Sequence, residues 1–432
     1  MRRKPRKAGG FQFEVTIEEV GGLGDGIAHL GDGRLTYVPL TVAGDRVLAR
    51  TRGEKSGTIL GEIVELLEAG PDRQEPPCPH FGLCGGCQLQ QMSDSTYLPF
   101  KENRVKEAIT KAGFDLSCFE GMQSVESSSR RRVTFAAEKQ KKNTKLGFRG
   151  KASHDLIDIT QCEVLHPILL EALPGLRKLA ALFLQEQKQI GLSVNLVDNG
   201  LDILVESHQE ASLNQRLDTV DLARTNDWAR VSWQGKDRHP DPLIMQREPF
   251  VTFGGYKVPV PSGAFLQPSI EGEGKLTEAV MQMLSGRYRS IADLFSGCGT
   301  FAFALAEKGK VIAFESGEEA LKSQLAAIDR AQISGRIVPT QRDLERNPLT
   351  VAELNKFDAV VLDPPRKGAK PLVDNLAQSS VKEVVYVSCN PSSWARDATI
   401  LKAGGYHLDR IIAVDQFTWT AHVELVSKFC KD

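Results

Sequence analysis

The spacing of hydrophobic residues divides this 432-residue chain into regions of different character. Residues 11–68 alternate apolar and polar positions in short runs, and Gly-Gly, Gly-Asp and Asp-Gly pairs interrupt these runs. A period of two with frequent turn residues predicts short antiparallel strands. We therefore expect a small β-barrel in residues 1–70.

A Pro-rich stretch, PDRQEPPCPH, follows the expected barrel and marks the first boundary. In residues 95–113 the apolar positions fit a period of 3.6, which predicts a helix that ends at Gly113. The chain then mixes strand-like runs with one helix near residues 167–187, so a central α+β domain is expected over residues 71–262.

The pattern becomes regular in the last region, residues 263–432, where short apolar runs alternate with helical periods. This alternation predicts an α/β domain with a parallel, doubly wound sheet whose two faces are buried. Strands are expected over residues 290–295, 310–316, 336–343, 357–363 and 383–389, and helices over residues 274–284, 301–309, 318–331 and 371–378.

Composition narrows the class of protein. The apolar fraction of 41% and the charged fraction of 25% are typical of a soluble globular protein. No apolar run is long enough to span a bilayer, and the basic start lacks the apolar core of a signal peptide, so we expect a cytoplasmic protein. In that compartment cysteines serve as metal ligands, nucleophiles or buried packing residues rather than in disulfides.

Positive charge is concentrated in two segments although the net charge is only −1. Residues 1–7 carry five Arg or Lys, and residues 129–151 carry nine against one acid, Glu138. Such segments fit phosphate binding, as in an RNA-binding protein, and fit an ordinary solvated charge run equally well.

A glycine turn, Gly297-x-Gly299, joins a predicted strand to a helix. Glycines there let a ligand approach the backbone, and Glu315 at the end of the next strand can bind ribose hydroxyls. Ala302 replaces the last glycine of the dinucleotide pattern, which favours a cofactor such as S-adenosylmethionine over NAD. Asp343, at the end of the third strand, fits either an adenine contact or a helix cap.

Two further strands end in reactive groups. Asp363 begins an Asp-Pro-Pro motif, and Arg366 follows where enzymes that methylate exocyclic amines have an aromatic residue, so that activity is disfavoured. Cys389 ends the fifth strand, at the sheet edge where open α/β folds bind ligands. Burial is the ordinary explanation of a cysteine, but a thiolate at this edge can act as a nucleophile if its pKa is lowered there.

A thiol is useful for methylating carbon 5 of a pyrimidine, which is a poor nucleophile. Addition of the thiolate to carbon 6 produces an enolate with electron density at carbon 5. After methyl transfer a base must remove the proton at carbon 5 before the thiol can leave. We assign Glu424 as this base and His422 as a positioning or stacking residue.

Four cysteines have the character of metal ligands. Cys78-x5-Cys84-x2-Cys87 lies in a Gly/Pro-rich stretch, and Cys162 is a candidate fourth ligand. Four thiolates suit zinc or an iron–sulfur cluster, and spacing alone leaves both open.

Taken together, these motifs resemble the RNA uracil-carbon-5 methyltransferase family over nearly the whole chain, in particular its iron–sulfur-containing 23S rRNA type. The resemblance implies an amino-terminal TRAM RNA-binding barrel, a 4Fe–4S cluster on the four cysteines, and a Rossmann-like class I methyltransferase domain. It also implies Cys389 as nucleophile and Glu424 as base. The cofactor contacts that it implies are Gln267, Phe295, Thr300, Glu315, Asp343 and Asp363.

Some residues depart from the family pattern. Phe417-Thr418-Trp419 stands where Phe-Pro is frequent, Ser269 replaces an Asn, and no tyrosine precedes Arg130. The departures leave the nucleophile and the base intact. Phe265 and Trp419 are candidates for stacking on a base that is flipped into the site.

The prediction is therefore a monomeric enzyme that makes 5-methyluridine in RNA, with ribosomal RNA favoured over transfer RNA by the resemblance. A cytosine-carbon-5 methyltransferase shares the thiol chemistry but typically has a second cysteine, where this chain has Arg366. A non-enzymatic iron–sulfur RNA-binding protein is the alternative of another class, and the intact Cys389 and Glu424 argue against it.

Overall fold

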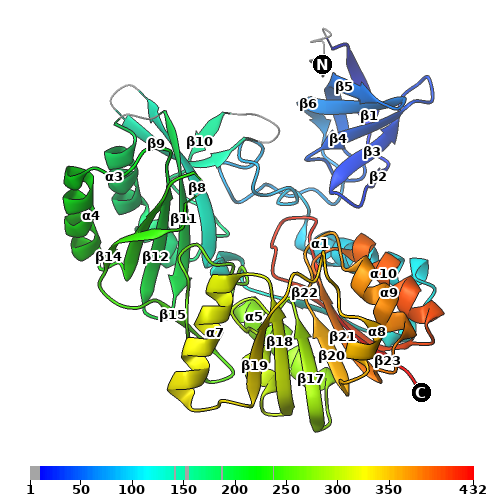
Figure 1. Ribbon diagram of the computed structural model, residues 1–432. Coiled ribbons are helices and arrows are strands. Elements are labelled where there is room, and N and C mark those ends of the chain that lie inside the picture. The colour runs from blue at the N-terminus through cyan, green and yellow to red at the C-terminus, as the bar shows by residue number, and fades with distance from the viewer. Residues whose placement is uncertain (1–9, 141–142, 151–154, 186–187, 237) are drawn as a thin grey trace, which may run out of the picture. The chain divides into compact units, whose positions relative to one another are not determined.

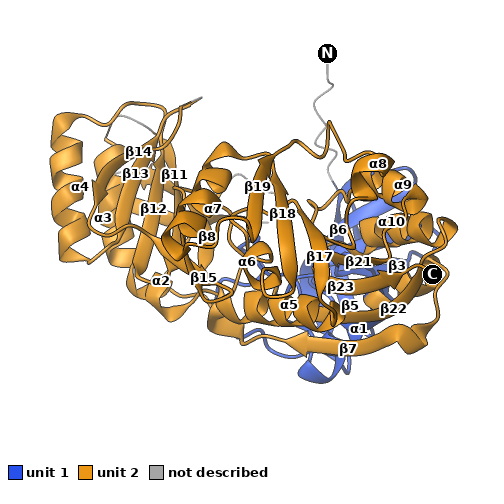
Figure 2. Ribbon diagram, turned by 60° about the horizontal axis from the view of Figure 1, so that its bottom comes forward, with its two compact units in different colours: residues 1–104, 150–153, 417–421 blue, residues 105–149, 154–416, 422–432 orange. Residues whose placement is uncertain are grey.

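The computed structural model describes residues 10–140, 143–150, 155–185, 188–236 and 238–432 (Figure 1). The basic segment 1–7 and parts of the basic segment 129–151 lie outside these residues. The chain divides into two compact units, one of residues 1–104, 150–153 and 417–421 and the other of the remaining residues (Figure 2).

The first unit contains a six-stranded, curled, barrel-like sheet, drawn in blue in Figure 1. Its strand order is β1-β5-β6-β4-β3-β2. The strands are β1 (Gln12–Thr16), β2 (Glu19–Val20), β3 (Asp25–His29), β4 (Leu35–Pro39), β5 (Arg46–Lys55) and β6 (Thr58–Glu68). Alternate residues such as Val47 and Ala49 are buried in its small core, as the sequence pattern predicts.

A long helix, α1 (Asp94–Lys111), follows the cysteine loop and confirms the predicted helix. Gly113 has a φ of 80°, a conformation that side chains disfavour and that ends helices. In the second unit Val105 and Ile109 of this helix are buried in a large apolar core.

The second unit contains a seven-stranded sheet of order β10-β9-β8-β11-β12-β13-β14. Its strands are β8 (Arg132–Gln140), β9 (Asn143–Arg149), β10 (Leu156–Asp158), β11 (Gln189–Val197), β12 (Gly200–Glu206), β13 (Arg230–Gln234) and β14 (Asp241–Met245). The helices α2 (Pro167–Glu171), α3 (Leu173–Phe183) and α4 (Leu213–Thr225) belong to this part, and α3 and α4 pack on the sheet. A hairpin of β15 (Phe250–Phe253) and β16 (Tyr256–Pro259) leads out of it.

The second unit also contains an eight-stranded sheet of order β19-β18-β17-β20-β21-β23-β22-β7. Its strands are β7 (Phe119–Ser124), β17 (Tyr288–Leu294), β18 (Gly309–Glu315), β19 (Ile337–Gln341), β20 (Ala359–Leu362), β21 (Glu383–Ser388), β22 (His407–Asp415) and β23 (Glu424–Cys430). The five strands from β17 to β21 are parallel, as predicted, but β23 runs antiparallel to both β21 and β22.

Helices pack on both faces of this sheet, so its central strands are mainly apolar. They are α5 (Ile270–Met283), α6 (Ala302–Leu305) and α7 (Glu318–Ala331), then α8 (Val351–Leu354), α9 (Lys370–Gln378) and α10 (Pro391–Ala403). The helix predicted over residues 301–309 is only the single turn α6. Strand β7, which the sequence placed with the central domain, pairs with β22 at the edge of the sheet.

Within the described residues, no helix has the length and apolar character needed to cross a membrane.

A buried ion pair in the seven-stranded sheet gives a test of stability. Arg230 donates to both carboxylate oxygens of Asp202, at 2.8 and 2.9 Å, and both side chains are almost inaccessible. Asp202→Ala would leave the guanidinium buried without its partner, which costs about 3–5 kcal/mol of unfolding free energy. Urea unfolding measures this. Asp241→Ala, which breaks an exposed pair with Arg216, is the control and should cost less than about 1 kcal/mol.

Candidate active site

The ends of β20 and β21 and the start of β23 meet at one edge of the eight-stranded sheet. The register places Ser388 of β21 opposite Leu425 of β23, so the adjoining residues Cys389 and Glu424 stand side by side. Leu362 of β20 pairs with Tyr386, and the next residue on β20 is Asp363. The predicted nucleophile, base and Asp-Pro-Pro carboxyl are therefore brought together.

Cys389 lies between β21 and α10, just before residues that are typical of the start of a helix. Asn390 caps the helix by accepting from the Ser392 N–H (3.1 Å), and Pro391 occupies the first helical position. The Asn390 amide also donates to the Arg366 carbonyl (3.0 Å), which ties this turn to the Asp-Pro-Pro loop. The thiol thus has a fixed direction.

The Cys389 thiol is half-buried, and its surroundings do not lower its pKa. Burial, together with the nearby carboxyls of Glu424 and Asp363, raises the pKa of the thiol to about 12, which Arg366 opposes only in part. The thiol therefore carries its proton in the free enzyme. It becomes a nucleophile only as that proton leaves during attack.

Glu424 begins β23 and is buried, with 4% of its surface exposed. Burial, followed by the charge of Asp363, raises the pKa of Glu424 above its ordinary range, and a hydrogen bond from Gln416 opposes this rise. A carboxylate whose pKa lies nearer to neutrality is a stronger base than an exposed one. This property suits proton removal from carbon.

Asp363 is held by Gln267, another predicted residue. The Gln267 amide donates to Asp363 Oδ2 (3.3 Å), and burial raises the pKa of Asp363. Gln267 is itself buried, and its backbone carbonyl accepts from Arg131 (3.1 Å), whose guanidinium also pairs with Glu273 of α5 (2.5 Å). One of the basic residues that the sequence offered for RNA contact is thus a buried structural residue.

The glycine turn after β17 has the geometry of a ligand-binding loop. Gly297 has a φ of 55°, and a Cβ placed on it would meet nothing within 4 Å, so this side of the turn is open. The Glu315 carboxylate accepts from the N–H of Gly297 (2.9 Å) and of Gly317 (2.7 Å). Thr300 lies in the same turn, and Phe295 before it has a φ of 66°, a strained conformation typical of functional sites.

A cavity of about 260 Å³ opens beside this turn. Three predicted cofactor contacts, Phe295, Glu315 and Asp343, line it, together with Phe314 and Pro365. A lining of carboxylates and aromatic rings suits a nucleoside, with the ribose hydroxyls on an acid and the nucleobase against a ring. Gln267, Thr300 and Asp363 are not among the described lining residues.

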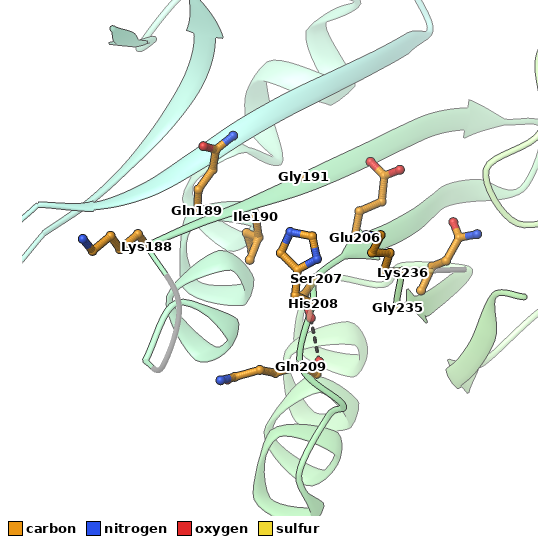
Figure 3. A pocket seen from close by; sticks show the side chains of 11 residues that line it. Lys188, Gln189, Ile190, Gly191, Glu206, Ser207, His208, Gln209, Gly235 and Lys236 are labelled. Carbon is orange, nitrogen blue, oxygen red and sulfur yellow. Dashed lines mark hydrogen bonds between the residues drawn. The ribbon is translucent and has the colours of Figure 1, made fainter. Parts of the chain in front are cut away.

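A second hollow, of about 800 Å³, lies on the seven-stranded sheet where β12 and β13 end (Figure 3). Its lining includes Lys188, Glu206, His208 and Lys236. Its lining residues include no cysteine and none of the predicted site residues, which lie elsewhere in the chain.

The predicted cluster ligands lie in different parts of the chain. Cys78, Cys84 and Cys87 occupy the loop between β6 and α1 in the first unit, and Cys162 belongs to the second unit. Over the described ranges, no three His, Cys, Asp or Glu side chains are placed so as to hold a metal ion. Cys84 Sγ accepts a hydrogen bond from the Gly86 N–H (3.4 Å).

The stacking candidates differ in their placement. Phe265 is 62% exposed, and the Arg132 guanidinium lies over its ring at 4.7 Å from the centroid. Trp419 belongs to the first unit, where its N–H donates to the Tyr97 hydroxyl (2.7 Å) and its carbonyl accepts from Gln88.

Two buried polar residues at this edge were not predicted from the sequence. Asp293 lies near the end of β17 and is completely buried; burial and the charge of Asp363 raise its pKa to about 8. Gln416, just after β22, contacts both Gln267 and Glu424. The only signal in the sequence was position, because both residues are at strand ends close to predicted site residues.

A doubly wound sheet with a glycine turn, a nucleoside-sized cavity and acids at its carboxyl edge is the fold of S-adenosylmethionine-dependent methyltransferases. The same fold occurs in the Pyrococcus abyssi tRNA (uracil-54, C5)-methyltransferase, solved with S-adenosyl-L-homocysteine. That structure matches with a TM-score of 0.73 and 23% sequence identity over 96% of this chain and 99% of the other.

The chain belongs to the RNA (uracil-5-)-methyltransferase family. The family model described as tRNA (uracil-5-)-methyltransferase matches residues 255–428. An uncharacterized RNA methyltransferase of Brucella suis is 38% identical, covering 97% of this chain and 98% of the relative. The 23S rRNA (uracil(1939)-C(5))-methyltransferase of Vibrio vulnificus is 28% identical, covering 97% of this chain and 96% of the relative.

The buried carboxyl of Glu424 makes stability depend on pH. Because its pKa is raised on folding, the folded chain keeps a proton that the unfolded chain loses above about pH 4–5, so its contribution to stability falls as pH rises. Glu424→Gln removes this loss. The difference between the melting temperature of the variant and that of wild type should therefore increase as the pH is raised from about 5 to about 8.

Thermal melts at matched ionic strength measure this difference. Glu307→Gln, at an exposed position, is the control and should show a difference that does not change with pH. A constant difference for Glu424→Gln as well would show that the carboxyl is not held protonated by the fold.

Proposed function

We propose that this enzyme methylates carbon 5 of a uridine in ribosomal RNA, with Cys389 as nucleophile and Glu424 as base. The observation that carries the proposal is the strand register that sets Cys389 beside Glu424 at the edge that also bears Asp363. Methylation of an exocyclic amine needs no thiol, whereas methylation of pyrimidine carbon 5 needs both a thiol and a base.

The steps follow from the residues. The Cys389 thiol would pass its proton to solvent water while its sulfur adds to carbon 6 of the uracil, so that the C5=C6 electron pair moves to carbon 5. S-adenosylmethionine, once bound, would supply the methyl group to carbon 5, with its sulfur–methyl bond breaking to leave S-adenosylhomocysteine. Glu424 then accepts the proton from carbon 5, the C5=C6 bond re-forms, and the sulfur–carbon bond breaks to return the thiolate. The target uracil must leave its stack in the RNA so that Cys389 can meet carbon 6 from one face of the uracil ring.

The cofactor cavity supports this assignment of roles. Phe295, Glu315 and Asp343 line it and would hold the nucleoside part of S-adenosylmethionine. Asp363 ends β20 beside β17, and its N–H donates to the Leu294 carbonyl (3.2 Å). It therefore lies between the glycine turn and Cys389, at the topological switch point of the sheet where open α/β folds bind ligands.

Ribosomal RNA is proposed over transfer RNA because a 23S rRNA methyltransferase aligns with this chain from end to end. The family description and the solved structure both name tRNA, so tRNA is the second candidate. The barrel-like sheet of the first unit is proposed to act as the TRAM RNA-binding module that the family resemblance implies.

RNA that carries 5-fluorouridine tests both the mechanism and the substrate. Fluorine at carbon 5 cannot leave as a proton, so wild-type enzyme should stop at a covalent adduct with 23S rRNA transcripts, visible as a shifted band in a denaturing gel. Cys389→Ala should form no adduct. Adduct on tRNA transcripts instead would assign the substrate to tRNA, and active enzyme without any adduct would refute the mechanism.

We also propose the 4Fe–4S cluster, supported by the set of four thiols and by the N–H bond to Cys84 Sγ. Anaerobically purified protein should contain about four iron and four sulfide per chain and absorb in the visible range. Cys162→Ser should lose most of this iron, whereas Cys118→Ser, outside the set, should keep it. Colourless protein that contains zinc would refute the cluster.

A further inference from the structure

Gln416 lies between two residues of the candidate active site, Gln267 and Glu424. It follows the last residue of β22 and is 5% exposed. Its amide nitrogen donates to two acceptors, Gln267 Oε1 at 2.9 Å and Glu424 Oε1 at 3.0 Å. One buried amide thus holds the base and the neighbouring glutamine together.

The hydrogen bonds continue beyond Gln267, whose own amide nitrogen donates to Asp363 Oδ2 at 3.3 Å. Two amides therefore lie in series between the two carboxyls, Glu424 and Asp363. Each amide directs its nitrogen at a carboxyl oxygen, Gln416 at Glu424 Oε1 and Gln267 at Asp363 Oδ2. The orientation of Gln416 follows from this chain of bonds.

Gln416 is also fixed by packing against α5. A Cβ built on Gly272 would lie 2.8 Å from both Gln416 Cβ and Gln416 Oε1, so glycine is needed there to admit the side chain. The Gly272 N–H donates to the Ser269 hydroxyl (2.8 Å), which caps α5. The first turn of the helix is thus held in place and forms one wall for the amide.

The two oxygens of Glu424 are not equivalent. Oε1 accepts from Gln416, whereas Oε2 is buried and, in the part of the chain that is described, has no hydrogen-bond partner. A buried carboxylate oxygen without a donor is costly, and such groups are typical of functional sites. It is the oxygen with lone pairs available for a proton.

Resting on the function proposed above, we propose that Gln416 is a positioning residue: it holds Glu424 by one oxygen and leaves the other to take the carbon-5 proton. Its donated bond also favours the ionised carboxylate, against burial and the charge of Asp363. The charged or titratable groups that act on Glu424 and Cys389 at this edge are Asp363 and Arg366.

The test separates proton removal from the earlier steps. RNA with tritium at carbon 5 of uridine and S-adenosylmethionine labelled on the methyl group report tritium release and methyl transfer in the same first turnover. For Gln416→Leu, which keeps the volume and removes the donor, methyl transfer should stay within about threefold of wild type. Tritium release should slow about 10- to 100-fold, the expected effect of losing a bond to a charged group.

The pH profile gives a second readout that a general loss of packing would not move. Without the donated bond, the midpoint of tritium release should move to higher pH. Glu424→Gln serves as the reference for a missing base and should show methyl transfer followed by very slow tritium release. Equal slowing of both steps in Gln416→Leu, or an unchanged pH midpoint, would overturn the proposal.

A pair of glycines in α5 provides matched variants that leave Gln416 intact. Gly272→Ala should press on the amide and slow tritium release more than methyl transfer. Gly274→Ala, where an added Cβ meets nothing within 4 Å, should behave as wild type. Both changes raise the intrinsic helix propensity, but a Cβ at position 272 would also lie 2.9 Å from the Ser269 hydroxyl that caps α5, so thermal melts of the two variants must agree before their kinetics are compared. Normal tritium release by Gly272→Ala would count against the proposal.

The wild-type enzyme distinguishes this inference from the proposed function. If wild type forms no adduct with 5-fluorouridine RNA, the assigned reaction fails whatever Gln416 does. If wild type forms it and the Gln416→Leu variant releases tritium at the normal rate, only the role of Gln416 fails. Circular dichroism of each variant confirms that it is folded before kinetics are compared.

Discussion

The antiparallel course of β23 is the constraint on which the site depends. In a parallel sheet, functional residues gather where strands end, and a strand that runs the other way begins at that same edge. Because β23 is inserted between β21 and β22 in the opposite direction, its first residue, Glu424, meets Cys389 at the end of β21. The proposed nucleophile and the proposed base, 35 positions apart along the chain, become neighbours through backbone pairing alone.

This arrangement buries several ionisable side chains away from water. Burial raises the pKa of Cys389, Asp363 and Glu424, and each negative charge raises the pKa of its neighbours. The same effects make Glu424 a better base and the folded chain less stable at high pH. The basicity of Glu424 and the loss of stability at high pH thus have the same physical origin, the raised pKa of buried carboxyls. The amides of Gln267 and Gln416 oppose this rise by donating hydrogen bonds to the carboxyls.

Much of this site can be predicted from the sequence because its chemistry depends on local patterns. Cys389 and Asp363 follow apolar runs that are confirmed as β21 and β20, and the glycine turn follows β17. Long-range pairing was not predictable in the same way. The strand β7 joins the far edge of the sheet, and β23 reverses its direction, because register and order arise from contacts between distant segments rather than from a residue pattern. The raised pKa of Cys389 was missed because it reflects burial and neighbours that only the fold brings together.

The position of Gln416 in the site could not be predicted from the sequence. Glutamine is an ordinary polar residue, and its type carries no signature of catalysis or of burial. Its importance comes from three neighbours on separate elements: Gln267 before α5, Gly272 within α5, and Glu424 on β23. Gly272 leaves room for the Gln416 side chain, and the Gln416 amide donates to two acceptors. Neither feature can be recognised before these elements are packed together. A carboxylate acts as a precise base only when its direction is limited, so in the proposed reaction Gln416, which donates to Glu424, contributes to the geometry as much as the strand that carries Glu424.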